Sequence, residues 1–505
     1  MRSRAVAGWS LAAILLLAPG VRAGDREEEK KNAAIEKAFF EEYASAGDEK
    51  ARAKAVETLS TAPDAVKVSV LVEKVLPKDD AGEVQSAAVA VLRRVKDDEP
   101  LRAMVAGAQG KDPWPARTTV IEALGGSASP VAVEGLRRIL KSTETKSVAA
   151  ALFALAENHP AEALDDVRKL TEHLAWQVRL GTLEYLGRLK DPKTLDLLAD
   201  RLEAESGRLK HEVVDTLKAI SGKDYGTDAL KWRAYAAGGE KAAEAAGVKP
   251  GDPAGGAGAG SGRAVATGTP PVAPTYYGLK VWSDRVVFVI DFSLSMNEEM
   301  VIDRDTLVRE TGAVVSSGHG EGDAKKPEPP KGDDEVIPIE WWKIKTRMDF
   351  ARSQLRYVIS ILKHDQWFDV VWFSDSVVAW QGRMVPAARA TKTRAADWLD
   401  SLKCEGGTNT WGGLTKALNL VGKGGEDENY GRGADTIYFL SDGEPSKGDI
   451  KDKEQIVAAL ARIEKVRHVK IHVIQIGTSP LPFMKQIAAV TGGDYKFFNA
   501  KGPAK

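Results

Sequence analysis

Apolar residues in the first half of the chain recur with the spacing of amphipathic helices. Six segments share this pattern and end on a leucine: ARAKAVETL, VQSAAVAVL, ARTTVIEAL, SVAAALFAL, VRLGTLEYL and LKHEVVDTL. These leucines follow one another every 31 to 33 residues, at Leu59, Leu92, Leu124, Leu155, Leu186 and Leu217. Shorter amphipathic segments lie between them, and Pro130 and Pro192 mark two of their first turns, where proline is well tolerated. The pattern predicts a helical pair repeated along residues 51–220.

A single pair of short amphipathic helices cannot bury its apolar faces, whereas stacked pairs can. The period and the two helices per unit resemble the HEAT-repeat family. We therefore expect an all-α, HEAT-like solenoid over residues 26–236, with a leading helix in residues 26–50 and a C-terminal cap in Ser221–Tyr235. The resemblance implies a curved scaffold that binds proteins, and a passive spacer is the alternative.

Residues 237–275 differ in composition from the segments on either side. PGDPAGGAGAGSG and TGTPPVAP are rich in glycine, alanine and proline and poor in large apolar residues. Such a segment buries too little apolar surface to fold, so we expect a flexible linker. The two halves of the chain would then move semi-independently.

The hydrophobic pattern changes again after residue 276. RVVFVID, at Arg285–Asp291, is a run of apolar residues of the kind found in strands buried on both faces. Further strands are expected in FDVVWFS, DTIYFLSDG and VKIHVIQIG, and helices in RMDFARSQLRYVISIL, WGGLTKALNLV, IVAALARIEKV, FMKQIAAVTGG and Ala395–Leu402. Alternating strands and helices predict an α/β doubly wound, Rossmann-like domain over residues 276–505.

Oxygen-bearing side chains follow three of these elements. Asp291 ends the first strand and precedes Ser293 and Ser295, Thr408 lies just before a helix, and Asp442 follows a later strand. Ligand sites of such sheets lie at the carboxyl ends of the strands, where these residues can converge. Hydroxyl and carboxylate oxygens are ligands of hard divalent cations, so we expect Mg²⁺, or alternatively Mn²⁺ or Ca²⁺, at this place. With few anionic ligands the metal would stay electrophilic and would take a carboxylate from a partner.

The Thr408 loop and the two aspartates belong to a wider motif. D-x-S-x-S at Asp291, G-G-T-N-T around Thr408 and S-D-G at Asp442 together resemble the von Willebrand factor A family, over residues 284–500. The resemblance implies that Asp291, Ser293, Ser295, Thr408 and Asp442 form a metal-ion-dependent adhesion site. It implies Mg²⁺ or Mn²⁺, and binding rather than catalysis. Gly406 and Gly407 would allow the threonine loop to approach closely.

Two features depart from the family pattern. Leu294 stands where many relatives have glycine, and a polar insertion at residues 297–345 separates the serines from the first helix. Within this insertion GHGEGDAKKPEPPKGDDE has the composition of a disordered segment. The C-terminal end of the insertion carries Trp341 and Trp342. The insertion either shapes the metal face or is an ornamental loop.

The net charge and the N-terminal sequence indicate which partners and which cellular location to expect. The formal net charge of −1 gives no electrostatic case for nucleic acid as a partner. Residues 1–23 combine Arg2 and Arg4 with a short apolar run and a small-residue cleavage site after Ala23, as in a secretory signal peptide; an uncleaved anchor is the alternative. The chain is therefore expected to be exported, to the periplasm, the cell envelope or the medium, with no later membrane span. The single cysteine, Cys404, is expected to be a packing residue.

The sequence thus favours an exported protein-interaction module that is not an enzyme. It would bind an acidic group of a protein partner through the cation, with the helical array as a second docking surface and the oligomeric state left open. One alternative is a magnesium-dependent phosphohydrolase, but that chemistry needs a second acid where Ser293 stands. The other is a structural envelope protein with a non-functional metal site. His468 and His472 lack the clustered ligands of a zinc site.

Overall fold

The computed structural model describes residues 23–158, 160–245, 274–316, 336–420 and 433–502. The expected signal peptide, apart from Ala23, and the segment GHGEGDAKKPEPPKGDDE lie outside these residues. The chain divides into two compact units, residues 1–136 and 137–505, which are described in turn. None of the described helices has the length and apolar character needed to cross a membrane.

The first unit consists of paired helices. Helices α1 (Ala23–Ser45), α2 (Glu49–Thr58), α3 (Asp64–Val70), α4 (Gly82–Leu92), α5 (Asp98–Gln109) and α6 (Trp114–Gly125) follow one another, and α7 (Pro130–Ile139) begins at its end. Helix α4 packs between α2 and α6. Leu59, Leu92 and Leu124 are each no more than 1% exposed, so the periodic leucines form the core of this unit, as the repeat pattern predicts.

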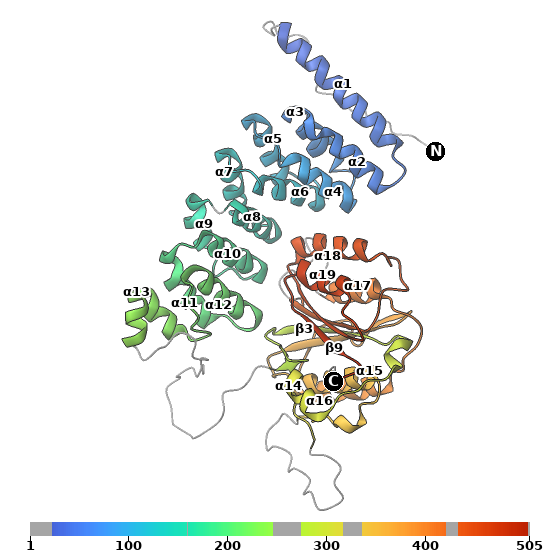
Figure 1. Ribbon diagram of the computed structural model, residues 1–505. Coiled ribbons are helices and arrows are strands. Elements are labelled where there is room, and N and C mark those ends of the chain that lie inside the picture. The colour runs from blue at the N-terminus through green and yellow to red at the C-terminus, as the bar shows by residue number, and fades with distance from the viewer. Residues whose placement is uncertain (1–22, 159, 246–273, 317–335, 421–432, 503–505) are drawn as a thin grey trace, which may run out of the picture. The chain divides into compact units, whose positions relative to one another are not determined.

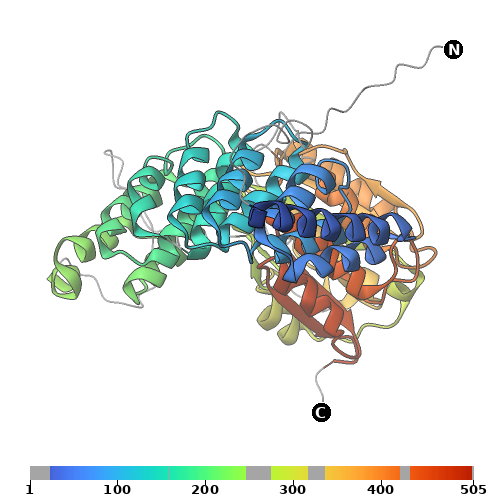
Figure 2. The same cartoon turned by 90° about the horizontal axis from the view of Figure 1, so that it is seen from above.

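The second unit begins with the remaining helical pairs. These are α8 (Thr145–Asn158), α9 (Leu164–Arg168), α10 (Trp176–Leu189), α11 (Leu195–Ala204), α12 (Gly207–Ser221) and α13 (Ala229–Ala245). Helix α10 packs between α8 and α12, and Figure 2 shows these green helices side by side. Leu155, Leu186 and Leu217 are buried between them. Pro130 starts α7, and Pro192 starts the 3-10 turn Pro192–Thr194 that leads into α11, as their sequence positions predict.

The end of the array differs from the expected boundary. Tyr225 and Trp232 are fully buried, and both ring systems contact Tyr235, so this segment covers the last repeat as expected. However, α13 continues to Ala245, whereas the linker was expected from residue 237. The alanine-rich end of the helix favours this extension, and Gly239, with φ of 67°, forms a kink within it. Residues 246–273 lie outside the described chain.

A seven-stranded sheet forms the centre of the α/β domain. Its parallel strands are β3 (Arg285–Asp291), β4 (Trp367–Phe373), β7 (Thr436–Ser441), β8 (Lys470–Gly477) and β9 (Tyr495–Asn499), in the spatial order β4-β3-β7-β8-β9. Short antiparallel strands β5 (Val377–Ala379) and β6 (Val385–Pro386) pair with β4. The chain passes from β3 to β4 on one side and later to β7 on the other, so the direction of winding reverses at β3. This confirms the doubly wound fold and places the topological switch point at the end of β3.

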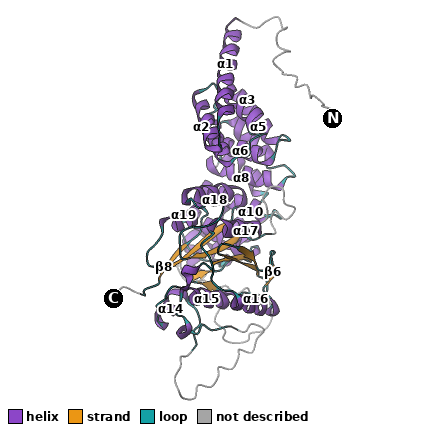
Figure 3. Ribbon diagram, turned by 90° about the vertical axis from the view of Figure 1, so that its right-hand side faces the viewer, coloured by secondary structure: helices purple, strands orange, loops and turns teal. Residues whose placement is uncertain are grey.

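Helices cover both faces of the sheet (Figures 1 and 3). Helices α15 (Arg347–Ile361) and α16 (Arg389–Ser401) lie on one face, and α17 (Thr410–Leu420), α18 (Lys453–Arg467) and α19 (Pro482–Val490) lie on the other. Along β3, Phe288 and Ile290 join the core of the first face, while Val287 and Val289 join that of the second. Both faces of β3 are therefore apolar, which explains its unbroken hydrophobic run.

The insertion at 297–345 is partly built into the domain. It contains α14 (Arg304–Thr311) and the 3-10 turn Trp341–Lys343. Met300, Leu307 and Ile339 are almost fully buried in the core beneath α15. The described ends of the insertion thus add apolar side chains to the core, although the insertion as a whole was expected to be polar. A small hairpin, β1 (Thr275–Tyr276) and β2 (Leu279–Lys280), precedes β3.

Within the second unit, α12 contacts the amino-terminal ends of β7 and β8. The guanidinium of Arg208 donates to the carbonyl oxygens of Asp435 at 2.8 Å and His468 at 2.6 Å. Glu212, one turn further along α12, forms a 2.7 Å ion pair with Lys470. These contacts hold the last repeats against the α/β domain, in contrast to the semi-independent movement that the linker composition suggests.

Candidate metal centre

The five oxygen-bearing residues expected to bind a cation lie at the carboxyl edge of the sheet. Asp291 is the last residue of β3, and Asp442 directly follows the neighbouring strand β7. Ser293 and Ser295 lie in and beside the 3-10 turn Leu294–Asn297, and Thr408 precedes α17. All are buried except Ser295, which is half-buried. The structure therefore brings side chains from three loops to the switch point of the sheet.

Asp291 is fully buried and accepts hydrogen bonds from neutral groups. Its Oδ1 accepts from the backbone N–H of Ser293 at 2.8 Å, and its Oδ2 accepts from the hydroxyl of Ser441 at 2.5 Å. Burial raises the pKa of Asp291 above its usual range, and the nearby charge of Asp442 raises it further. Ser441 was not expected at the site, because a serine that ends an apolar strand carries no sequence signal of its partner.

The side-chain oxygens of Ser293, Ser295 and Asp442 have the spacing of ligands around one small cation. Ser293 Oγ lies 3.0 Å from Ser295 Oγ, and Ser295 donates to Asp442 Oδ1 at 2.8 Å. Octahedral magnesium with metal–oxygen distances of about 2.0–2.1 Å has neighbouring ligands roughly 3 Å apart. The oxygens of Ser293, Ser295 and Asp442 therefore have the spacing that a hard divalent cation needs.

Backbone hydrogen bonds fix the threonine loop against the other two. Leu294 N–H donates to the carbonyl of Gly406 at 3.1 Å, and Thr408 N–H donates to Ser446 Oγ at 2.9 Å. Gly406 has φ of +60°, and a Cβ there would lie 2.5 Å from the carboxyl carbon of Asp375. A side chain at this position would have to displace the Asp375 carboxylate and would adopt a backbone conformation that favours glycine. The close approach expected of this glycine is therefore present.

Arg347 also reaches the site, and the sequence analysis did not identify it. Its Nη1 donates to Asp442 Oδ2 at 2.7 Å, and its Nη2 donates to Glu298. Burial raises the pKa of Asp442, while the bonds from Arg347 and Ser295 act in the opposite direction. Arg347 follows the insertion, far from the D-x-S-x-S motif in sequence, so only the fold shows this contact.

The types of ligand at this edge of the sheet bear on which metal ion it could hold. Among the described residues, no three or more histidine, cysteine, aspartate or glutamate side chains are grouped so that they alone could hold a metal ion. By their chemistry, two carboxylates and three hydroxyls suit Mg²⁺, Mn²⁺ or Ca²⁺ better than zinc. Burial raises the pKa of the Cys404 thiol to about 11, so this cysteine is protonated at neutral pH and suited to packing.

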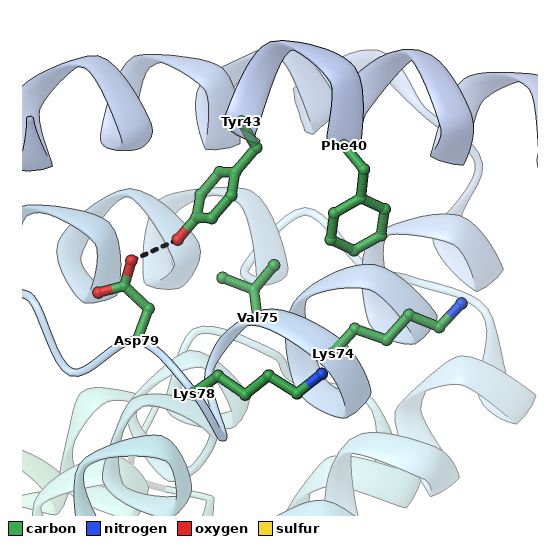
Figure 4. Close-up of a pocket in the computed structure, with 6 residues that line it drawn as sticks. All are labelled: Phe40, Tyr43, Lys74, Val75, Lys78 and Asp79. Carbon is green, nitrogen blue, oxygen red and sulfur yellow. Dashed lines mark hydrogen bonds between the residues drawn. The ribbon is translucent and has the colours of Figure 1, made fainter. Parts of the chain in front are cut away.

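A pocket of about 330 Å³ lies in the first unit, and Figure 4 shows its lining. The hydroxyl of Tyr43 donates to the carboxylate of Asp79 at 2.5 Å, and Arg52 binds the same carboxylate. The only acid among the lining residues is thus already paired. The lining consists of Phe40, Tyr43, Lys74, Val75, Lys78 and Asp79. It offers no cation site comparable to the carboxyl edge of the sheet.

Comparison with protein families agrees with the two architectures. The model of HEAT repeats matches residues 68–152 and 133–218, and the model of the von Willebrand factor type A domain matches residues 343–497. The chain carries HEAT repeats and a von Willebrand factor type A domain. The matched part of the A domain includes Thr408 and Asp442. Asp291, at the end of β3, and Ser293 and Ser295, just after it, precede the matched residues and are separated from them by the insertion.

Curated relatives share only a part of their length with this chain. Inter-alpha-trypsin inhibitor heavy chain H1 of Sus scrofa is 31% identical over 108 residues, which is 21% of this chain and 12% of the relative. The human von Willebrand factor A domain-containing protein 3B is 23% identical over 157 residues, or 31% of this chain and 11% of the relative. The chain thus spans about an eighth of the length of these relatives or less.

Solved structures give only slight likenesses. A mutant of the PilB minor pilin from Streptococcus sanguinis covers 43% of this chain and 57% of its own, at 15% identity and a TM-score of 0.25. An engineered protein covers 37% of this chain and 95% of its own, at 19% identity and a TM-score of 0.23.

Proposed function

We propose that the A domain binds a divalent cation, Mg²⁺ or alternatively Mn²⁺ or Ca²⁺, and through it a carboxylate of a protein partner. The ligands would be Asp291, Ser293, Ser295, Thr408 and Asp442. The observation that carries this proposal is the convergence of these oxygens beside Asp291, a fully buried carboxylate that accepts from the neutral donors Ser293 and Ser441. A buried charge without a cation costs free energy, and a metal ion would supply the compensation.

Each residue would have a distinct task at this site. The hydroxyls of Ser293, Ser295 and Thr408 would be neutral ligands, and Asp291 and Asp442 would supply charge directly or through water. Ser441 would orient Asp291, because it donates to Oδ2 and leaves Oδ1 beside the Ser293 backbone. When bound, the cation supplies the positive charge that attracts an anionic group. Binding rather than catalysis follows because Ser293 stands where a phosphohydrolase would need its second acid.

We further propose that the HEAT repeats offer a second surface for a protein partner. Stacked helical pairs present an extended face that a single domain of this size lacks. Export remains part of the proposal and rests on the N-terminal sequence alone, with its two arginines and short apolar run.

Capture of partner proteins tests this function. The immobilised full chain is exposed to an extract of the source cell envelope and to the medium, either with Mg²⁺ at about 5 mM or with EDTA. The proteins retained under the two conditions are then compared. Wild type should retain proteins only with Mg²⁺, and Ser293→Ala should lose them. Ser401→Ala, which removes an exposed hydroxyl at the end of α16, is the control and should bind like wild type. Equal retention in EDTA, or by Ser293→Ala, would contradict the metal mechanism.

A further inference from the structure

Arg347 is a buried cation at the proposed metal site. Its side chain is 8% exposed, and its Nη1 lies 2.7 Å from Asp442 Oδ2. The main chain fixes its position, because Arg347 N–H donates to the carbonyl of Glu298 at 3.0 Å and Thr346 caps α15 just before it. The first turn of α15 thus positions the guanidinium beside Asp442.

The two acidic partners of Arg347 differ in their environment. The Asp442 side chain is fully buried, whereas that of Glu298 is 61% exposed. Exposed ion pairs contribute little, and removal of one partner from a buried pair leaves an uncompensated charge. The pair with Asp442 is therefore the significant one, and Glu298 serves mainly to orient the outer nitrogen of Arg347.

Asp442 is shared between the proposed metal ligands and this arginine. Its Oδ1 accepts from Ser295, and its Oδ2 accepts from Arg347. A divalent cation beside Ser295 would therefore bind a carboxylate whose charge Arg347 already neutralises. The positive charge of Arg347 would lie on the other oxygen of the same carboxylate. Two cations around one carboxylate repel each other, more strongly in a buried site than in water.

We propose that Arg347 is a resident cation of the site that competes electrostatically with the divalent metal for Asp442. This inference rests on the proposed function of the same site. In the metal-free protein Arg347 compensates the charge of Asp442 and keeps the carboxylate in place. In the metal-bound protein the same charge weakens the hold on the cation. Arg347 thus lowers the affinity of the site for the metal and stabilises the metal-free site.

Calorimetric titration of the full chain with Mn²⁺ tests this inference, together with thermal unfolding in EDTA. Arg347→Gln should bind Mn²⁺ about tenfold more tightly than wild type, within the usual range of coupling between two sites. In EDTA the same variant should unfold at a lower temperature, because Asp442 loses its counter-charge. Arg356→Gln is the matched control: it lies on the same helix and loses an exposed pair with Asp400, so it should leave Mn²⁺ affinity unchanged.

The possible outcomes separate the inference from the proposed function. Weaker Mn²⁺ binding by Arg347→Gln would overturn the competition and make Arg347 a support for the metal ligands. Unchanged affinity would overturn it as well. Absence of Mn²⁺ binding in both wild type and variant would instead overturn the proposed metal site, while the unfolding temperatures in EDTA would still test the role of Arg347 as a counter-charge. If Arg347→Gln fails to fold, Arg347→Met takes its place, because methionine is a flexible, unbranched side chain without the charge. It should also bind Mn²⁺ more tightly than wild type, and an equal or lower affinity would overturn the competition.

Discussion

Asp291 shows how one residue can be unfavourable for the fold and central to the site. It ends a strand in which the five preceding side chains are apolar, and it is fully buried. Its hydrogen bonds come from Ser293 and Ser441, which are neutral, and the nearby Asp442 repels its charge. The metal-free domain therefore carries a strained electrostatic arrangement that a cation would relieve.

The substitution Asp291→Asn should accordingly stabilise the metal-free domain. Asparagine has nearly the same shape and can still accept from Ser293, while the buried charge is removed. We expect the unfolding temperature in EDTA to rise, by about 2–4 °C for each kcal/mol gained. Added Mg²⁺ should raise the unfolding temperature of wild type but not of this variant. Differential scanning calorimetry measures both, and a lower unfolding temperature in EDTA would contradict the electrostatic account.

At the scale of elements, the site depends on loops that approach one another closely. The loop before α17 binds the turn after β3 through Gly406, and it approaches Asp375 in the loop after β4. Gly407 N–H donates to the Asp375 carboxylate at 2.7 Å. Thr408 is thus positioned by backbone contacts with loops on either side rather than by its own side chain.

The substitution Gly406→Ala should disturb both stability and metal binding. A left-handed backbone costs a non-glycine residue about 1–2 kcal/mol, and the clash with Asp375 adds to this. Gly222→Ala is the matched control, because Gly222 has φ of +69° with no atom within 4 Å of its added Cβ. Chemical denaturation should show the larger loss for Gly406→Ala, and only this variant should bind Mn²⁺ more weakly. Equal losses of stability would show that the contact with Asp375 contributes nothing.

The sequence predicted the elements whose hydrophobic pattern is strong. The run RVVFVID coincides with β3, and the periodic leucines lie in the cores of the repeats. The short antiparallel strands and β9 were missed, because a few half-buried residues leave no clear period. The five expected site residues follow from their places at strand and helix ends. Arg347 and Ser441 do not, because their roles depend on neighbours distant in sequence.

At the scale of the whole chain, the described contacts link part of the array to the A domain. Within the second unit, Arg208 of α12 and the ring of Phe153, stacked 3.7 Å from His468, meet the end of the sheet opposite the proposed site. Arg208 is 7% exposed, and its bonds to two backbone carbonyls satisfy groups at the starts of β7 and β8. The last repeats and the A domain are therefore held together by direct contacts.

Cleavage of the chain between these parts tests that contact. A specific protease site placed within residues 246–273 would allow the peptide chain between the array and the A domain to be cut. We expect the two fragments of the otherwise unchanged chain to elute together in size-exclusion chromatography. Arg208→Glu should separate them, because it places a carboxylate against the carbonyls of Asp435 and His468. Lys210→Glu, on the same helix, is the control and should leave them associated. Separation of the unsubstituted fragments would contradict the account.

Calorimetric titration of the full chain with Mn²⁺ tests the central claim most directly. The geometry of the three loops predicts one Mn²⁺ ion per chain. The double variant Ser293→Ala, Ser295→Ala should lose this binding while it remains folded. Wild type that binds no Mn²⁺, or a double variant that binds it with the affinity of wild type, would contradict the claim that these loops form a metal site.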